Sequence, residues 1–348
     1  MEDTIPRMRF LCFGVGAIGT YIGGSLALSG QEVVFFDRIE IADYVRENGL
    51  LIHAGGQANR LQKVDICTSL EEALTHGPFD VAILAVKSYD TAAVIEMMRD
   101  YSAALPPILC FQNGVENEAT LRSAMGSGKV VSGTLTSAIG KLNIGEVVVE
   151  KLRGIGVACD HLLATGLVKV LDAAGLRAQL FEDAGSMKWS KMLTNLPANA
   201  TSAILNMTAT EIYQNLDLCK LEIQMLREAL AVMRALHYKV VDLPGTPTKI
   251  LAFGATKLPI FLAQPFLIQG IGKGRGNKMP SFHIDFHSGS GKSEVEYLNG
   301  AVVRIGQSVG VEAPVNQMLT ETLTLLTEGK LSAADFDHNP GQLLKRLK

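Results

Sequence analysis

Three glycines early in the chain constrain its fold more than any other feature. In the segment FGVGAIG, residues 13–19, Gly14, Gly16 and Gly19 have the spacing G-x-G-x-x-G. The apolar run RFLCF precedes them, and AIGTYIGGSLALSG, which has helical spacing, follows. A glycine turn between a strand and a helix is the context that a dinucleotide-binding fold requires. We therefore predict a Rossmann-type unit in this part of the chain.

Each glycine of the turn has a separate physical reason. Gly14 permits the tight turn, Gly16 lets the backbone approach a pyrophosphate, and Gly19 lets the helix pack closely on the strand. The N-terminus of the helix offers N–H groups and a partial positive charge to the phosphates. The alternative, a glycine-rich turn without a ligand, is disfavoured by the strand–helix context. The predicted cofactor-binding turn consists of Gly14, Val15, Gly16, Ala17, Ile18 and Gly19.

Two residues at the end of the second predicted strand, EVVFFD, bear on the choice of dinucleotide. Asp37 would bind the ribose hydroxyls of NAD and repel a 2′-phosphate. Arg38 follows at once and could pair with that phosphate or stack on adenine. These two residues alone leave NAD and NADP open.

The first half of the chain alternates strand-like and helix-like segments. DVAILAVK, from Asp80, is a continuous apolar run typical of a buried parallel strand, and TAAVIEMMRDYSAAL, from Thr91, has helical spacing. This alternation predicts an α/β fold with a doubly wound sheet. Near residue 183 the pattern becomes mostly helical. We therefore expect a Rossmann dinucleotide-binding domain over residues 1–182 and an all-α substrate-binding and catalytic domain over residues 183–348.

One stretch of the helical half, residues 243–281, is rich in glycine and proline and has no clear period. Loops of this length inside a compact domain are usually functional or disordered. We expect a long loop here, with the apolar part LPIFLAQPFLIQGIG buried or lid-like. The segment GKGRGNK, residues 272–278, is expected to be a flexible cationic loop.

The overall composition argues against several classes of protein. The 348 residues include 32 lysines and arginines and 35 acidic residues, which argues against nucleic acid or an anionic membrane as the main partner. We see no signal peptide, and the most apolar segment is too short to span a bilayer. Five scattered cysteines without a C-x-x-C motif indicate reduced thiols, and we expect a cytoplasmic protein.

A second group of candidate residues lies in KWSKMLTNLPANA, residues 188–200. At about 100° per residue, Lys191, Asn195 and Asn199 fall on one stripe of a helix, which Pro197 should bend. When a ketone is reduced, negative charge develops on the carbonyl oxygen, and a lysine ammonium can supply the proton. Neutral asparagines can bind a hydroxyl and a carboxylate without competing for that proton. The alternative is an ordinary solvated face.

Other polar and aromatic residues receive a simpler interpretation. The segment FHIDFH places His283, Asp285 and His287 at alternate positions, and a strand or a helix would bring the two histidines together. This is a conceivable metal site, but reduction with a lysine acid needs no metal, and we assign none. We expect Trp189 in the core and Glu296 on the surface.

Several blocks of the sequence together resemble the ketopantoate reductase (2-dehydropantoate 2-reductase) family. The blocks are GVGAIG, AVKSYD, FQNG, KMLTNLPANATSAILN and PSFHID with SEVEYLNGAVVRIG, and they follow the family's order over roughly residues 8 to 328. The resemblance implies an oxidoreductase in which hydride from NAD(P)H reduces a small 2-oxo acid. The leading substrate is 2-dehydropantoate, which gives (R)-pantoate for pantothenate and coenzyme A biosynthesis.

The resemblance also implies roles for individual residues. Lys191 matches the catalytic proton donor, and Glu294 matches a glutamate linked to the cofactor and to that lysine. Arg38 aligns with the arginine that meets the 2′-phosphate of NADP. The residues implied at the nicotinamide half are Lys87 and Asn113. The substrate-binding residues implied are Asn195, Asn199, Ser281 and Asp285.

Two departures from the family's pattern bear on cofactor and substrate. Arg38 leads us to expect NADP as the coenzyme. Asp37 is unusual beside that arginine, so NAD stays open as an alternative. Ala209 stands where many members carry another substrate-contacting asparagine, which keeps open a reductase of a bulkier keto acid. A non-catalytic protein that senses a dinucleotide is the alternative from another class. The partners expected are a small 2-oxo acid and a second copy in a homodimer, with no nucleic acid and no membrane.

Overall fold

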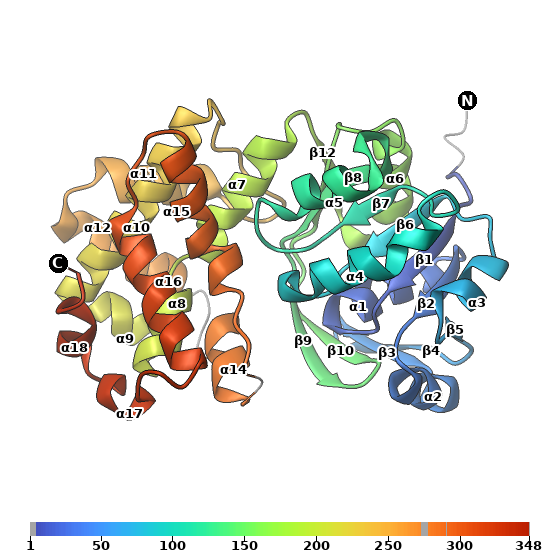
Figure 1. The fold of residues 1–348 in the computed structure, drawn as a ribbon, viewed down its shortest axis with the longest axis horizontal. Helices are drawn as coiled ribbons and strands as arrows, with labels where there is room; N and C mark the ends of the chain where they lie inside the picture. Colours follow the sequence, from blue (N-terminus) through green and yellow to red (C-terminus); the bar gives the residue numbers. More distant parts are fainter. Residues whose placement is uncertain (1–4, 273–277, 290, 348) are drawn as a thin grey trace. The chain divides into compact units, whose positions relative to one another are not determined.

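The computed structural model describes residues 5–272, 278–289 and 291–347, and its contacts divide the chain into two units. The first unit contains the described residues up to Lys188 together with Leu243–Thr246. The second contains Trp189–Asp242 and the described residues from Pro247 onward. In Figure 1 the strands run from blue to green, and the helices of the second unit run from yellow-green to red. The domain boundary that we expected between residues 182 and 183 stays a prediction.

The first unit is built on an eight-stranded sheet. Its strands β8, β7, β6, β1, β2 and β5 are neighbours in that order, and all their pairings are parallel. Counted along the chain, this is the 3-2-1-4-5-6 order of Rossmann folds, which reverses between β1 and β6. The predicted doubly wound sheet is confirmed. The strands are β1 (Arg9–Phe13), β2 (Glu32–Phe36), β5 (Asp65–Cys67), β6 (Val81–Leu84), β7 (Ile108–Cys110) and β8 (Val130–Leu135).

Further strands extend this unit. β11 (Ile155–Ala158) pairs antiparallel with β8 and parallel with β12 (Ala178–Phe181) at the edge of the large sheet. A separate four-stranded sheet has the order β4-β3-β10-β9. Its strands are β3 (Leu50–Ala54), β4 (Gln57–Leu61), β9 (Ala138–Asn143) and β10 (Glu146–Lys151).

Apolar side chains cover both faces of the large sheet. In β1, Phe10 and Cys12 belong to one core cluster, whereas Leu11 and Phe13 belong to another, as the alternation along a strand requires. Both faces are therefore covered by helices, as predicted. The first face carries α1 (Ala17–Leu28), α2 (Ile39–Asn48) and α6 (Ala164–Leu171), and the second carries α3 (Leu70–Thr75), α4 (Thr91–Met98) and α5 (Asn117–Met125).

Helices form the described part of the second unit, as predicted. α7 (Ala184–Asn195) begins in the first unit and ends in the second. The long helix α10 (Leu216–Ala235) packs against its neighbours α9, α11 (Thr248–Lys257), α15 and α16. Trp189 is 3% exposed and Glu296 is exposed, so both simple interpretations are confirmed. The other helices are α8 (Asn199–Leu205), α9 (Ala209–Gln214), α14 (Ser281–His287), α15 (Asn299–Ser308), α16 (Pro314–Thr327), α17 (Ala333–Phe336) and α18 (Pro340–Leu344).

The prediction of a long loop over residues 243–281 is wrong. The segment contains α11 (Thr248–Lys257), α12 (Ile260–Leu267) and a π-helical turn, Ile268–Gly272. Pro247 and Pro259 stand immediately before α11 and α12. Proline is tolerated where a helix begins because the N–H that it lacks has no partner there, so these prolines mark helix starts. The cationic loop expected at residues 272–278 falls largely outside the described residues.

No helix in the described part of the chain is both long enough and apolar enough to cross a membrane.

Candidate active site

The predicted cofactor residues of the first unit lie at one edge of the parallel sheet. The glycine turn follows β1, Asp37 and Arg38 follow β2, Lys87 follows β6, and Asn113 follows β7. Since β2, β1, β6 and β7 are adjacent and parallel, their carboxyl ends lie at the same edge. Doubly wound sheets bind their ligands at this edge, where the strand order reverses.

The glycine turn has a geometry that only glycine permits at two positions. Gly14 has a φ of 90°, in the left-handed region, and its N–H donates to the Phe36 carbonyl at 2.9 Å. A Cβ on Gly19 would lie 1.9 Å from the carbonyl oxygen of Gly14, so a larger residue does not fit. A Cβ on Gly16 would meet no heavy atom within 4 Å, so there is open space over the start of α1. The turn therefore fits a pyrophosphate group.

The carboxylate of Asp37 is fixed beside this turn. Its Oδ2 accepts a hydrogen bond from the Val15 N–H at 2.6 Å, and its Oδ1 accepts one from the Arg38 N–H at 2.8 Å. Arg38 directly precedes α2, and its side chain is exposed. A negative charge is thus held against the turn, next to an exposed cation. Both residues follow β2, where Rossmann folds carry the residues that meet the adenosine ribose of a dinucleotide.

The loops that carry Lys87 and Asn113 are joined by the side chain of Gln112. Its Nε2 donates to the carbonyls of Val86 and Lys87, at 3.0 and 3.3 Å, and to the hydroxyl of Thr91 at 2.8 Å. Gln112 is 3% exposed. The loop after β7 is therefore bonded to the loop after β6, and the two candidate residues belong to one rigid assembly.

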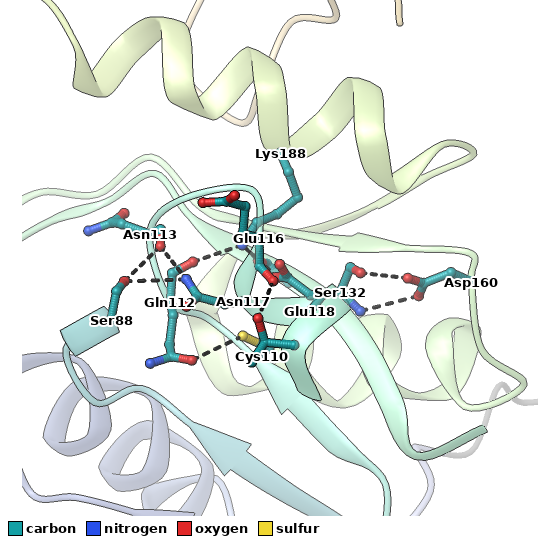
Figure 2. Close-up of polar contacts among 12 residues, drawn as sticks. Ser88, Cys110, Gln112, Asn113, Glu116, Asn117, Glu118, Ser132, Asp160 and Lys188 are labelled. Atoms are coloured by element: carbon teal, nitrogen blue, oxygen red, sulfur yellow. Dashed lines mark hydrogen bonds and ion pairs between the residues drawn. The ribbon is translucent and has the colours of Figure 1, made fainter. Parts of the chain in front are cut away.

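The carbonyl of Asn113 is bound from the other side. It accepts hydrogen bonds from the Ser88 hydroxyl at 2.8 Å and from the Asn117 amide at 2.6 Å, as Figure 2 shows. Ser88 and Asn117 are buried, whereas Asn113 is exposed. The network thus fixes the backbone of Asn113 and leaves its side chain at the surface of the unit.

Lys191 and Asn195 lie one turn apart on α7, and both are partly buried. The helix ends at Asn195, because Pro197 has no N–H and Ala198 has a φ of 56°. Asn199 is the first residue of the separate helix α8. The single stripe predicted for Lys191, Asn195 and Asn199 is therefore wrong, since it would need one helix through all three.

Asn199 nevertheless contacts Ser281, another predicted substrate-binding residue. The Asn199 Nδ2 donates to Ser281 Oγ at 3.3 Å, and the Asn199 Oδ1 accepts from the Phe282 N–H at 2.9 Å. Asn199 is 3% exposed, while Ser281 is exposed. The fold thus brings together two residues that are 82 positions apart in the sequence. Because its amide binds the start of α14, Asn199 also has a structural role.

A buried carboxylate on α10 holds the junction between α7 and α8. The Glu222 Oε2 accepts from the Ala198 N–H at 2.7 Å and from the Tyr213 hydroxyl at 3.4 Å. The Glu222 Oε1 accepts from the Thr201 hydroxyl. Glu222 is 0% exposed. It therefore fixes the point at which the chain turns from Asn195 toward Asn199.

The two acidic residues predicted for this unit differ in their surroundings. Glu294 is 2% exposed and directly precedes a 3₁₀ turn, Val295–Tyr297. Asp285 is partly buried on α14, one turn after Ser281. A carboxylate buried as deeply as Glu294 requires polar or charged partners, which suits a residue predicted to pair with a lysine.

The histidines of α14 stack on each other. The ring centroids of His283 and His287 are 4.1 Å apart with an angle of 28° between the planes. His283 Nε2 bonds to the side-chain oxygen of Asn206 at 2.8 Å, and His287 Nε2 bonds to the Ala203 carbonyl at 3.3 Å. The helix does bring the two rings together, and both bind protein oxygens of or next to α8. Burial, and next the charge of His287, lowers the pKa of His283 to about 4.

This pKa shift predicts that stability falls in mild acid. Between pH 6.5 and 4 the unfolded chain protonates His283 and the folded chain does not, so the folded state loses stability as the pH falls. We expect His283→Gln, which can still donate to Asn206, to reduce the loss between pH 7 and 5 by about 1 kcal/mol, given solvent screening of a partly exposed ring. Urea unfolding at the two pH values measures this, and equal losses in both proteins would contradict it.

A further group of potential metal ligands lies at the edge of the sheet. Ligand atoms of Asp65, Cys67 and His76 lie within 4.8 Å of one another. Burial, and next the charge of Glu72, raises the pKa of the Cys67 thiol to about 11. Two of the three side chains contact each other, since His76 Nδ1 bonds to Asp65 Oδ2 at 3.1 Å.

Sequence reasoning missed the residues that hold the candidate site in place. Gln112 lies inside the block FQNG, and Lys188 is the first residue of the segment KWSKMLTNLPANA. Neither was predicted to have a role in the site. Glu222 lies in an amphipathic helix, where a glutamate is ordinarily a surface residue. Only the tertiary contacts of these residues show what they do.

Comparison with known proteins identifies the family. One family model, described as ketopantoate reductase PanE/ApbA, matches residues 10–158, and its C-terminal counterpart matches residues 183–327. The chain belongs to the ketopantoate reductase family. The resemblance inferred from the sequence blocks is therefore confirmed. Ketopantoate reductases are pyridine-nucleotide-dependent oxidoreductases that act on a keto acid.

Curated relatives extend over nearly the whole chain. The 2-dehydropantoate 2-reductase of Archaeoglobus fulgidus is 26% identical over 315 residues, which cover 89% of this chain and 95% of the relative. The enzyme of the same name from Pyrococcus horikoshii is 24% identical over 321 residues, which cover 90% of this chain and 95% of the relative.

Solved structures share the fold of this chain. The ketopantoate reductase of Ralstonia eutropha JMP134 has a TM-score of 0.78 at 24% identity, covering 93% of this chain and 99% of that chain. D-mandelate dehydrogenase with NADH and anilino(oxo)acetate has a TM-score of 0.74 at 20% identity, covering 92% and 99%. Both show that this chain shares the fold of these proteins.

Proposed function

We propose that this protein reduces a small 2-oxo acid with a nicotinamide dinucleotide, with 2-dehydropantoate as the leading substrate and (R)-pantoate as the product. The observation that carries the proposal is the grouping of the glycine turn, Lys87 and Asn113 at the carboxyl edge of a parallel sheet, in a chain of the ketopantoate reductase family. The names of the relatives from Archaeoglobus fulgidus and Pyrococcus horikoshii support the same substrate.

The roles of the residues follow from the chemistry of a ketone. When bound, the reduced nicotinamide supplies a hydride for the carbonyl carbon. Lys191 gives a proton to the carbonyl oxygen as negative charge develops there, and then recovers a proton from water. Glu294 holds the Lys191 ammonium by a charge-assisted hydrogen bond. The neutral side chains that bind the carboxylate and hydroxyl of the substrate are those of Asn195, Asn199 and Ser281. Asp285, one turn after Ser281 on α14, is the fourth substrate-binding residue that we propose.

For the coenzyme we propose NADP, bound at its 2′-phosphate by Arg38, with NAD also accepted because of Asp37. The exposed guanidinium attracts the phosphate, while the carboxylate fixed at the Val15 N–H accepts from ribose hydroxyls and repels the phosphate. Arg38 and Asp37 together therefore set the ratio of kcat/KM with NADPH to kcat/KM with NADH.

Removing the charge of Asp37 should change this ratio. We expect Asp37→Ser to raise the ratio of kcat/KM with NADPH to kcat/KM with NADH by about tenfold, because one repulsive charge is lost while a hydroxyl remains for the turn. Initial rates with both coenzymes measure the ratio. Asp43→Ser, an exposed aspartate of α2, is the matched control and should leave it unchanged. An unaltered ratio in Asp37→Ser would mean that Asp37 only shapes the turn.

One experiment tests the function itself. Initial rates with NADPH and NADH are measured against 2-dehydropantoate, smaller 2-oxo acids and a phenyl-substituted 2-oxo acid. We expect the highest kcat/KM with 2-dehydropantoate. A preference for the phenyl compound would favour the bulkier-substrate alternative, as the ligand of the D-mandelate dehydrogenase structure suggests. Binding of the coenzyme without turnover of any compound would favour the dinucleotide sensor.

The cysteines support a proposal for the cellular setting. All five are free thiols, and Cys12, Cys67, Cys110 and Cys219 are buried. Reduced thiols suit the cytoplasm, which we propose as the location. A homodimer stays a prediction.

A further inference from the structure

A buried ion pair lies beneath the loop that carries Asn113. The Lys188 ammonium contacts the Glu118 carboxylate at 2.6 Å, and the two side chains are 6% and 5% exposed. Lys188 is on the part of α7 that belongs to the first unit, and Glu118 is on α5 of the same unit. Burying two charges is costly unless further hydrogen bonds offset the loss of water. The other hydrogen-bond partners of the Lys188 ammonium therefore indicate the role of the ion pair.

The Lys188 ammonium uses its other hydrogens on two backbone carbonyls. It donates to the carbonyl of Gln112 at 2.8 Å and to that of Gly133, on β8, at 3.2 Å. The Glu118 carboxylate adds the ion pair as a third polar contact of the ammonium group. The Gln112 carbonyl belongs to the peptide group that joins Gln112 to Asn113. Lys188 thus fixes the peptide plane directly before Asn113.

The peptide plane after Asn113 is fixed independently. Its carbonyl accepts from Ser88 and Asn117, at 2.8 and 2.6 Å. Figure 2 shows Lys188 on one side of the loop, and Ser88 and Asn117 on the other. With both flanking planes held, the backbone angles of Asn113 are fixed, and so is the direction of its Cα–Cβ bond, from which the exposed side chain extends.

The surroundings of Glu118 keep the same loop in one orientation. The Cys110 thiol donates to the Gln112 Oε1 at 3.7 Å. Burial first, and next the charge of Glu118, raises the pKa of that thiol, so it remains a neutral donor. With Oε1 turned to the thiol, the Gln112 Nε2 faces the loop after β6. The Gln112 side chain is therefore held by the Cys110 thiol and by the loop after β6, while its carbonyl is held by Lys188.

We propose that Lys188 and Glu118 are positioning residues, which fix the Gln112–Asn113 peptide so that the Asn113 side chain meets the nicotinamide half of the coenzyme. This inference rests on the proposed function. Lys188 also lies three residues before Lys191 on α7, so the same contacts anchor the start of the helix that carries the acid.

The test removes both charges at once. A single substitution would leave one charge buried alone, whereas an apolar pair of similar volume often folds as well as the ion pair. We therefore choose the double variant Lys188→Met/Glu118→Met, with Glu118→Gln as a milder second variant. The matched control is Asp160→Asn. Asp160 forms an ion pair at 2.5 Å with Arg122, which lies one turn after Glu118 on α5. The Asp160 carboxylate also accepts from the Ser132 hydroxyl, instead of binding the Asn113 loop (Figure 2).

The readout compares two ligands that share the adenosine end. Dissociation constants are measured for NADPH and for 2′-phospho-ADP-ribose, which lacks the nicotinamide ring. We expect the double variant to bind NADPH about tenfold more weakly, to bind the fragment as the wild type does, and to lose about 10²-fold in kcat. Glu118→Gln should show the same pattern to a smaller extent, and Asp160→Asn should match the wild type.

The outcomes separate the inference from the proposed function. If the wild type binds NADPH and reduces a 2-oxo acid, the proposed function stands, and the variants then decide the inference. Equal weakening of both ligands, or wild-type constants in the double variant, overturns it, because either result makes the ion pair purely structural. If the double variant does not fold, an unchanged preference for NADPH over the fragment in Glu118→Gln overturns it in the same way.

Discussion

Replacing Lys191 by alanine is expected to lower kcat by about 10²–10⁴-fold, the usual contribution of a general acid. The variant loses the group that protonates the carbonyl oxygen, so the negative charge that develops there is no longer neutralised. The binding of NADPH should stay nearly intact, because Lys191 lies in the second unit, whereas the glycine turn, Lys87 and Asn113 lie in the first. Steady-state rates give kcat, and quenching of protein fluorescence gives the dissociation constant of NADPH.

A matched lysine makes this result specific. Lys220 lies on α10 of the same unit, is exposed and pairs with Asp217 at 2.9 Å. Lys220→Ala should keep the wild-type kcat. If Lys191→Ala turned over normally, or if weaker NADPH binding were its main defect, Lys191 would not be the acid.

The first unit was predictable because its signals are local. The G-x-G-x-x-G spacing depends on steric limits within one turn, such as the 1.9 Å approach of a Cβ at Gly19 to the Gly14 carbonyl. The apolar runs of β1 and β6 are buried on both faces, as continuous apolar strands in a parallel sheet must be. Each of these features is decided by fewer than about ten residues of sequence.

The second unit was harder to predict where the backbone breaks. The spacing of Lys191, Asn195 and Asn199 fits one helix, and Pro197 was expected only to bend it. The helix ends instead, because Ala198 takes a left-handed conformation, with its N–H donated to Glu222. That partner is 24 residues away, so no local pattern reveals it. Asn199 reaches Ser281 only as a consequence of this break.

Buried charges are also invisible to periodicity. Lys188 lies 76 residues from Gln112, whose carbonyl it binds. In the sequence a lysine before Trp189 is an ordinary polar residue of a helix, since lysine is rarely buried. The predicted stripe falls on two helices, α7 and α8, and the role of its residues in catalysis stays a prediction. The contacts that fix these helices came from the fold.

Glu222 offers the largest expected effect on stability. In Glu222→Leu the Ala198 N–H and the hydroxyls of Thr201 and Tyr213 lose a buried acceptor. Each stranded donor costs about 1–3 kcal/mol, so we expect a loss of about 4 kcal/mol in the free energy of unfolding. Urea unfolding, with m compared between the proteins, measures it. Glu222→Gln should lose less, because the amide keeps one acceptor oxygen.

The substitution Glu222→Gln should also weaken the binding of the substrate. Since Glu222 fixes the junction before Asn199, Glu222→Gln should raise KM for the 2-oxo acid more than it weakens NADPH, measured where the variant is still folded. Glu321→Leu, an exposed glutamate of α16, is the control and should change the free energy of unfolding by less than about 0.5 kcal/mol. If the two leucine variants unfolded at the same urea concentration, the hydrogen bonds of Glu222 would not hold the junction, and another contact would have to keep Ala198 in its left-handed conformation.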